Sequence, residues 1–121
     1  MTISKFYYPN ASYRIHVDTD AENVAVAVIE ESTVVYSIQL DNTANAAASF
    51  LKIYNTTAAI TVGTTDPTDE YFVPASVSRT FIFPGGKTFA NGFHYACLTT
   101  AGTAGTTSPT SAAILRVCHS A

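Results

Sequence analysis

The sequence predicts an all-β protein: a single antiparallel β-sandwich, jelly-roll-like, with about eight strands. Short segments in which apolar and polar side chains alternate recur at a spacing of about ten residues, which is typical of a sandwich or barrel. Turn-forming Gly, Pro, Asn and Asp residues separate these segments, and no useful apolar pattern with the 3.6-residue period of a helix develops. Because 121 residues suit one domain, we expect residues 1–121 to fold as one unit, with residues 1–12 as a candidate extended arm.

Residues 80–99 are densely aromatic at both ends and are predicted to form two central core strands joined by a short connector. Phe81 and Phe83 lie on one face of the first strand, because side chains alternate along a strand. Pro84, followed by two glycines, ends this strand, since proline has no N–H for a sheet ladder and glycine permits turn conformations. A second turn signal precedes the other strand, residues 93–99.

The first third of the chain contains four apolar segments, residues 3–8, 13–18, 24–28 and 34–40. The segment 3–8 is apolar and aromatic and is predicted to be an edge strand or an arm. In the other three, one set of alternating side chains is expected to face the core. The predicted inward set is Tyr13, Ile15, Val17, Val24, Val26, Val28, Val34, Tyr36, Ile38 and Leu40. The predicted solvent-facing set of the segment 13–18 is Arg14, His16 and Asp18.

The rest of the chain adds shorter strands, predicted at residues 50–55, 71–73 and 112–118. Leu51, Ile53, Leu115 and Val117 are expected to face the core, and Lys52 and Arg116 the solvent. Residues 56–69 form a long polar connection, with or without a short strand at 59–62. Residues 101–110 are rich in Ala, Gly and Thr and are predicted to be a loop with a mobile tip.

The composition favours a protein that works inside an assembly. The charged fraction is 12%, about half of the usual roughly 25%, and a surface so poor in charge is weakly protected against association. The net charge is −3 without a basic stripe, which argues against nucleic-acid binding. The longest apolar run, residues 24–29, is too short to cross a membrane. Since the N-terminus lacks a secretory pattern, we expect synthesis and assembly in a cytoplasm.

Three residue groups suggest ion or phosphate binding but lack the full pattern. Gly86-Lys87-Thr88 resembles the end of a phosphate-binding loop, but the glycine required five residues earlier is Phe81. Lys87 is therefore expected to be solvated in a β-turn. The acidic clusters, expected to be solvated loop carboxylates, are Asp18, Asp20 and Glu22, and then Asp66, Asp69 and Glu70. The pairs His94 with Cys97 and Cys118 with His119 place their members on opposite sides of a strand, so no metal or cofactor is predicted.

Cys97 and Cys118 are expected to be free thiols in a reducing cytoplasm, and a disulfide between them stays open as an alternative. It would require their strands to pair. Cys118 shares its orientation with Arg116 and is expected to face outward, whereas Cys97 follows Phe93 and Tyr95 toward the core.

No arrangement of nucleophile, base and acid is visible, so the protein is predicted not to be an enzyme. Two readings of its aromatic residues remain: a core with its rim, which we favour, or a platform on which sugar rings stack. The residues concerned are Tyr7, Tyr8, Tyr36, Tyr54, Tyr71, Phe93 and Tyr95. Phe6, Tyr7 and Tyr8 are the candidate contacts for self-association, because aromatic residues ahead of a proline can anchor in a neighbour.

From residue 50 to the end, the chain resembles small virion structural proteins of tailed, marine-type bacteriophages. The resemblance lies in LKIYN (51–55), TVGTTDP (61–67), VPA (73–75), FPGG (83–86) and FANGF (89–93), together with the Ala/Gly/Thr-rich loop before the last strand. Cys97 and Cys118 depart from the pattern, and the N-terminal third has no counterpart in it.

The resemblance implies a jelly-roll-like subunit of a phage virion, with no catalytic or cofactor residues. Its expected role is capsid decoration or cement, and a tail, neck or fibre component is the alternative. Its expected partners are further copies of itself, as a homotrimer, and the major capsid protein or other virion subunits. A carbohydrate-binding module for adsorption to a host is the alternative from another class.

Overall fold

The computed structural model describes residues 3–7 and 13–120, and for residues 4–7 it describes the backbone alone. The described residues form nine strands and no helix. The strands are β1 (Ile3–Tyr7), β2 (Tyr13–Ala21), β3 (Val26–Ile29), β4 (Thr33–Asp41), β5 (Ser49–Tyr54), β6 (Asp69–Val73), β7 (Ser78–Phe89), β8 (Phe93–Leu98) and β9 (Ala113–Ser120).

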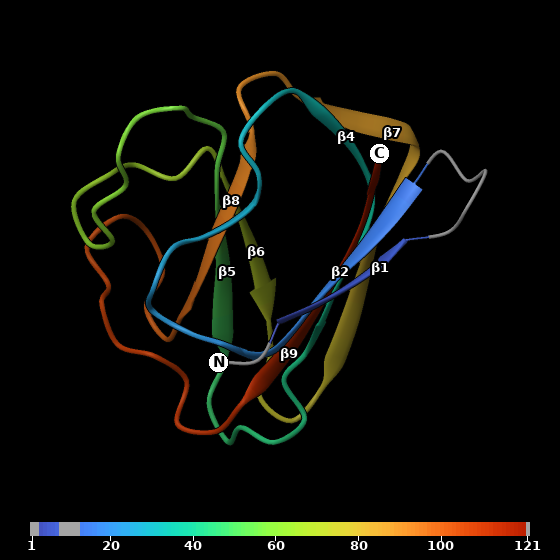
Figure 1. The fold of residues 1–121 in the computed structure, drawn as a ribbon. Helices are drawn as coiled ribbons and strands as arrows, with labels where there is room; N and C mark the ends of the chain where they lie inside the picture. Colours follow the sequence, from blue (N-terminus) through green and yellow to red (C-terminus); the bar gives the residue numbers. More distant parts are fainter. Residues whose placement is uncertain (1–2, 8–12, 121) are drawn as a thin grey trace.

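The strands form two sheets that face each other (Figure 1). One sheet has five strands in the order β1-β2-β9-β4-β7, and the other has four in the order β3-β8-β5-β6. Every pairing is antiparallel. From β2 onward the chain crosses between the sheets at each step except β5 to β6, which is the order of a jelly roll. The predicted all-β, jelly-roll-like sandwich is therefore confirmed.

The core lies between the two sheets and contains side chains from both. Its largest members include Ile38, Leu40, Leu51, Ile53, Phe89, Phe93, Tyr95, Leu115 and Val117. Phe89 and Phe93 meet edge to face with their centroids 4.9 Å apart, a favourable geometry for aromatic pairs. The predicted inward positions of β5 and β9 are thus confirmed.

A β-bulge at Tyr36 divides β4 into two parts with opposite alternation. Val35 is fully buried before the bulge, and Ile38 and Leu40 are fully buried after it. A bulge adds one residue to a strand and so moves the following side chains to the other face. The prediction that Val34 and Tyr36 share the buried face of Ile38 and Leu40 is therefore wrong, since both are only half buried.

The orientation of β2 is the reverse of the prediction. His16 pairs with Val117 and Asp18 with Leu115, and since those β9 residues are in the core, His16 and Asp18 also point inward. They are 1% and 0% exposed. The register places Arg14 on the inner side too, beside His119, and Tyr13, Ile15 and Val17 on the outer side.

The stretch around Phe81 also differs from the prediction. β7 continues through Pro84 to Phe89, because Gly85 and Gly86 adopt φ angles of 77° and 88° that allow the strand to bulge without ending. β7 and β8 belong to different sheets and do not pair. Phe81 and Phe83 are half buried and pack against the core through Tyr71, with ring centroids 4.9 and 6.0 Å away.

Two long connections, residues 55–68 and 99–112, lie side by side next to the four-stranded sheet (Figure 1). Gly102 joins the connection 99–112 to the sheet, because its N–H donates to Glu70 (2.8 Å) and its carbonyl accepts a hydrogen bond from the Lys52 ammonium. Lys52 faces away from the core, as predicted, but it is completely buried rather than solvated. Residues 59–62 form no strand. At β3, Val24 is exposed and Val26 half buried, whereas Val28 is buried as predicted.

The bulge in β4 gives a direct test of the side-chain orientation. Val35→Asp should prevent folding, because it places a charge in the core. Tyr36→Asp should leave a folded protein, since Tyr36 is half buried at the bulge. Urea unfolding followed by far-UV circular dichroism measures the stability of both variants. A Val35→Asp protein with a cooperative transition like that of the natural chain would contradict the assignment.

Candidate functional site

The structure places two of the three candidate assembly residues on β1. Phe6 pairs in register with Ile15, and Tyr7 pairs with Arg14. Tyr8 lies outside the described residues. The backbone of residues 3–7 is thus an edge strand of the five-stranded sheet, and the contacts predicted for its aromatic side chains remain a prediction.

A hydrogen-bonded chain of His16, Tyr95 and Asp18 is the most concentrated group of titratable side chains between the sheets. The Tyr95 hydroxyl donates to Asp18 Oδ2 at 2.5 Å. It lies 3.0 Å from His16 Nε2. A phenol has one hydrogen, and Tyr95 gives it to Asp18, so His16 must donate its Nε2–H to the phenol oxygen. The second carboxylate oxygen, Asp18 Oδ1, accepts the N–H of Asp20 at 2.9 Å.

This chain of hydrogen bonds is closed to solvent. Tyr95 and Asp18 are 0% exposed, and His16 is 1% exposed. Burial, with the hydrogen bond to Asp18 as the next cause, raises the pKa of Tyr95 far above its ordinary value, so the phenol stays protonated. A substrate has no route to these groups, and we interpret them as a link between β2 and β8 rather than as a catalytic site.

Cys97 is equally unsuited to nucleophilic chemistry. It is completely buried on β8. Burial raises its pKa to about 12, although the Ser49 hydroxyl opposes the shift, and only the thiolate is a good nucleophile. Cys118 is half buried on the outer side of β9. Both cysteines are free, as predicted, because they belong to different sheets and point in different directions.

A second buried polar group holds the loops at one end of the sandwich, and no sequence pattern predicted it. Asn42 is 0% exposed. Its amide donates to the carbonyls of Ala47 and Pro74, each at 3.0 Å, and its Oδ1 accepts from Ser49 and Asn45. This amide thus joins the β4–β5 connection to the β6–β7 connection. An alternating apolar pattern cannot reveal such a group, because its partners are mostly backbone carbonyls.

Asn45 extends the same group to the last loop. Its side chain exchanges two hydrogen bonds with the backbone of Ser111, donating at 3.0 Å and accepting at 2.7 Å. Asn45 is 4% exposed. Asn42 and Asn45, which resemble ordinary polar loop residues in the sequence, therefore anchor three connections. Their side-chain amides are hydrogen bonded inside the protein.

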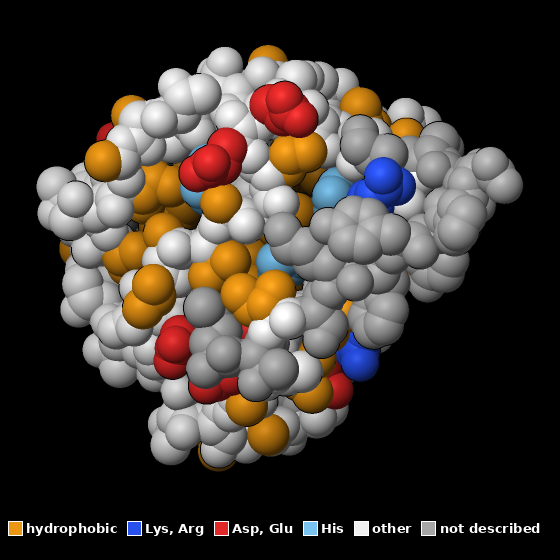
Figure 2. All heavy atoms as spheres, viewed as in Figure 1, with side chains coloured by type: hydrophobic (Ala, Val, Ile, Leu, Met, Phe, Trp, Pro, Cys, Tyr) orange, Lys and Arg blue, Asp and Glu red, His pale blue; other side chains and the backbone are white. Residues whose placement is uncertain are grey.

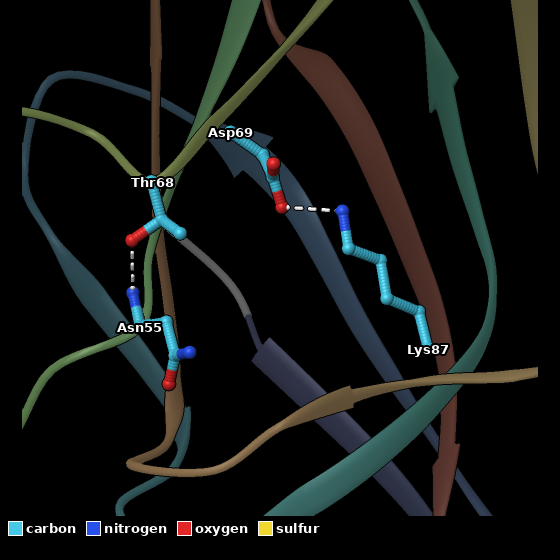
Figure 3. A network of polar contacts seen from close by, with 4 residues as sticks. All are labelled: Asn55, Thr68, Asp69 and Lys87. Atoms are coloured by element: carbon cyan, nitrogen blue, oxygen red, sulfur yellow. Dashed lines mark hydrogen bonds and ion pairs between the residues drawn. The ribbon is translucent and has the colours of Figure 1, made fainter.

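Lys87 joins the edges of the two sheets. Lys87 lies on β7, and its ammonium is 2.8 Å from Oδ2 of Asp69, the first residue of β6 (Figure 3). This hydrogen bond is the main reason that the pKa of Lys87 is raised. The ammonium is also 5.5 Å from the centre of the Phe89 ring. Next to it, the Asn55 N–H donates to Thr68 (2.9 Å). The predicted turn at Lys87 and the predicted loop at Asp69 are wrong, since both residues lie in strands. The two side chains are paired, although 40% of the Lys87 side chain and 25% of the Asp69 side chain stay exposed.

Two further acidic residues also hold the scaffold through hydrogen bonds. Asp66 accepts a hydrogen bond from Thr103 (2.6 Å), and Glu70 accepts the one from Gly102. Asp18 is in the core rather than in a solvated cluster with Asp20 and Glu22. No group of three potential metal ligands occurs among the residues that the structure describes.

Burial removes most of the predicted sugar-stacking platform. Tyr54, Phe93 and Tyr95 are at most 1% exposed, and Tyr36 and Tyr71 are half buried. Tyr7 and Tyr8 are the two members whose side chains the structure does not describe. The favoured interpretation of these rings as a core and its rim is therefore supported for the five described members.

The outer face of the five-stranded sheet is uncharged over most of its area. By register, one row across it is Ile15, Cys118, Ser37 and Ile82; the next is Val17, Arg116, Gln39 and Thr80; the third is Ile114, Asp41 and Ser78. Arg116 and Asp41 are the charged members. We call these three rows the outer face. A shallow hollow of about 250 Å³ in it is lined by Ile15, Cys118, Ser37, Gln39, Thr80 and Arg116.

The side of the molecule that Figure 2 shows is poor in charge as well. Figure 2 shows one side of the molecule, on which hydrophobic and uncharged groups cover most of the area and Lys and Arg are few. Ile82, on the outer face, is 71% exposed, and Val24, near β3, is 54% exposed. In the described part of the chain, no helix is long and apolar enough to cross a membrane.

Among solved structures, the chain is similar to a viral coat protein and to a cupin domain, each at low sequence identity. No protein-family model matches the chain, and no curated protein sequence matches it. The chain is similar to the solved coat protein of Tobacco streak virus, with a TM-score of 0.41 and 12% identity over 95% of this chain and 90% of that chain. It is also similar to the cupin domain of Schizosaccharomyces pombe Cnp3, with a TM-score of 0.38 and 8% identity over 98% of this chain and 59% of that one. Neither likeness is close enough to carry an argument about function.

Tyr95→Phe should destabilise the protein by about 1–3 kcal/mol, because it leaves buried polar groups on His16 and Asp18 without their shared partner. The free energy of unfolding in urea measures the effect. Tyr36→Phe is the matched control, since it removes a hydroxyl from a half-buried ring. Equal stabilities of the two variants would show that the buried hydrogen bonds do not hold β2 to β8.

The two thiols should differ sharply in reactivity. In the native protein at pH 8, a thiol reagent such as Ellman's reagent should label Cys118 and leave Cys97 untouched until urea unfolds the chain, because Cys97 is sealed and its pKa is about 12. Cys118→Ser should abolish the native-state labelling. Rapid labelling of two thiols in the folded protein would contradict the packing around β8.

Proposed function

We propose that this chain is a structural protein of a bacteriophage virion, and specifically a decoration or cement subunit of the capsid. The observation that supports the proposal best is the outer face, where apolar and uncharged side chains occupy an open sheet surface. A surface of this kind costs free energy in water and becomes favourable when another protein covers it. The sequence resemblance to phage virion proteins supports the same role.

The interior supports a structural role as well. The buried polar groups described above are engaged in joining strands and loops: Tyr95 with His16 and Asp18, and Asn42 with Asn45. Their solvent-inaccessible positions assign these groups to the scaffold. The proposed partners are further copies of the chain, as the trimer that the resemblance implies, and the major capsid protein. The alternative within the same class is a tail, neck or fibre subunit.

The proposal predicts that the chain is present in many copies in purified virions of the phage that encodes it. Mass spectrometry of particles purified on a density gradient should detect it in a fixed ratio to the major capsid protein. A density map of the particle should then place the jelly roll on the outside of the shell. Density at the tail or neck would replace decoration by the alternative. Absence of the chain from infectious particles would overturn the virion role altogether.

A further inference from the structure

We propose that a second copy of this chain packs on the outer face of the five-stranded sheet. The inference rests on the proposed role as a subunit of an assembly and names the surface of a two-fold contact between copies, which is separate from the contacts within the proposed trimer. Four observations carry it: the orientation of β2, the composition of the central row, the charges of the face, and its area.

β2 turns its apolar side away from the core of its own chain. Ile15 and Val17 lie on the outer face, Ile15 half buried and Val17 8% exposed within the single chain, whereas His16 and Asp18 lie between the sheets. An edge-proximal strand of a soluble monomer normally shows the opposite arrangement, with polar residues toward water. Apolar and polar residues alternate along β2 as regularly as in a half-buried strand. Its apolar side therefore has the composition of a sheet face that another layer covers.

The apolar character continues across the sheet in one row. Ile15 is followed by Cys118, Ser37 and Ile82, from β2 through β9 and β4 to β7. On the other side of Ile15 the row continues in register to the backbone position of Phe6 on β1. Ile82 is 71% exposed. The row crosses all five strands without a charged residue, and the hollow beside Ile15 and Cys118 gives the face relief into which a side chain can fit.

The charges of the face favour a copy of the same face as the occupant. Arg116 and Asp41 have opposite signs and lie in neighbouring rows. Hydrogen bonds from Thr43 and, to a smaller extent, the charge of Arg116 lower the pKa of Asp41, so its carboxylate is charged at neutral pH. Two such faces carry no net charge toward each other, and Arg116 of one copy can pair with Asp41 of the other. A partner with a strongly charged surface would gain nothing here.

The area is sufficient for a specific contact. Five strands about 4.8 Å apart and the eight residues of β9 at about 3.4 Å each give a projected area of roughly 600 Å². Two copies together would bury about 1,200 Å², the lower end of the range for specific protein–protein interfaces. The contact is therefore large enough to hold copies together, and small enough to dissociate on dilution.

The first experiment measures self-association of the full chain by sedimentation velocity over a range of concentrations. Ile82→Lys should raise the dissociation constant at least about tenfold, because it replaces the most exposed apolar side chain of the row, on the edge strand β7, by a charge. Val24→Lys is the matched control, since Val24 is also strongly exposed but lies near β3 of the other sheet, and it should change the constant less than about twofold. Urea unfolding verifies that both variants keep the native fold. Equal effects of the two substitutions would overturn the proposed surface.

A charge exchange tests whether the occupant is a copy of the same face. Arg116→Asp and Asp41→Arg each leave the face with two like charges, so each variant alone should associate more weakly than the natural chain. An equimolar mixture of the two should associate at least as well as the natural chain, because the faces then carry opposite charges. A mixture as weak as the separate variants would overturn a contact between like faces.

The native thiol gives an independent readout. Alkylation of Cys118 should slow at least about tenfold in the associated protein compared with the dilute monomer, while Cys97 stays unreactive in both. Cys118 that reacts equally fast in the associated chain, and is protected only on intact virions, would overturn the contact between copies and leave the virion role standing. Protection of Cys118 in the dilute monomer would also overturn the contact, since another part of the same chain would then cover the face.

Discussion

The hydrogen bond from the Tyr95 hydroxyl to the Asp18 carboxylate is the contact on which the arrangement of this protein depends. A carboxylate between two sheets is tolerated only when it is hydrogen bonded, and here Tyr95 and the backbone of Asp20 satisfy it. Tyr95 comes from the four-stranded sheet and Asp18 from the five-stranded sheet. The bond therefore joins the two layers, and it fixes which side of β2 faces inward.

That choice has consequences on the opposite side of the same strand. Because successive side chains of a strand point to opposite faces, an inward Asp18 and His16 require an outward Ile15 and Val17. On β2, the polar side chains are thus on the inner side, where hydrogen bonds satisfy them, and the apolar side chains are on the outer side. A chain that is stable as a sandwich is in this way left with a surface suited to association. The low charge of the whole sequence points in the same direction.

Buried polar groups elsewhere play the same structural part. Asn42 and Asn45 connect three loops at one end of the sandwich, Lys87 and Asp69 connect the edges of the two sheets, and Lys52 holds the last long loop. In each case one polar side chain replaces an apolar contact that a small core cannot supply. The sequence predicts loops and solvated residues at these positions, because its local pattern contains no information about partners that are as far as 66 residues away.

The sequence by itself determined the fold class, the positions of most strands and the core-facing residues of β5 and β9, since these follow from alternation and turn residues within a few neighbouring positions. It favoured free thiols at Cys97 and Cys118 but left a disulfide between them open. The tertiary structure decided the rest. The bulge at Tyr36 reversed the side-chain alternation in one half of β4. Packing against Tyr95 and Leu115 placed the side of β2 that carries His16 and Asp18 toward the core. Alternation states that a strand has two different sides, but only the residues packed against it, which come from distant parts of the chain, decide which side is buried.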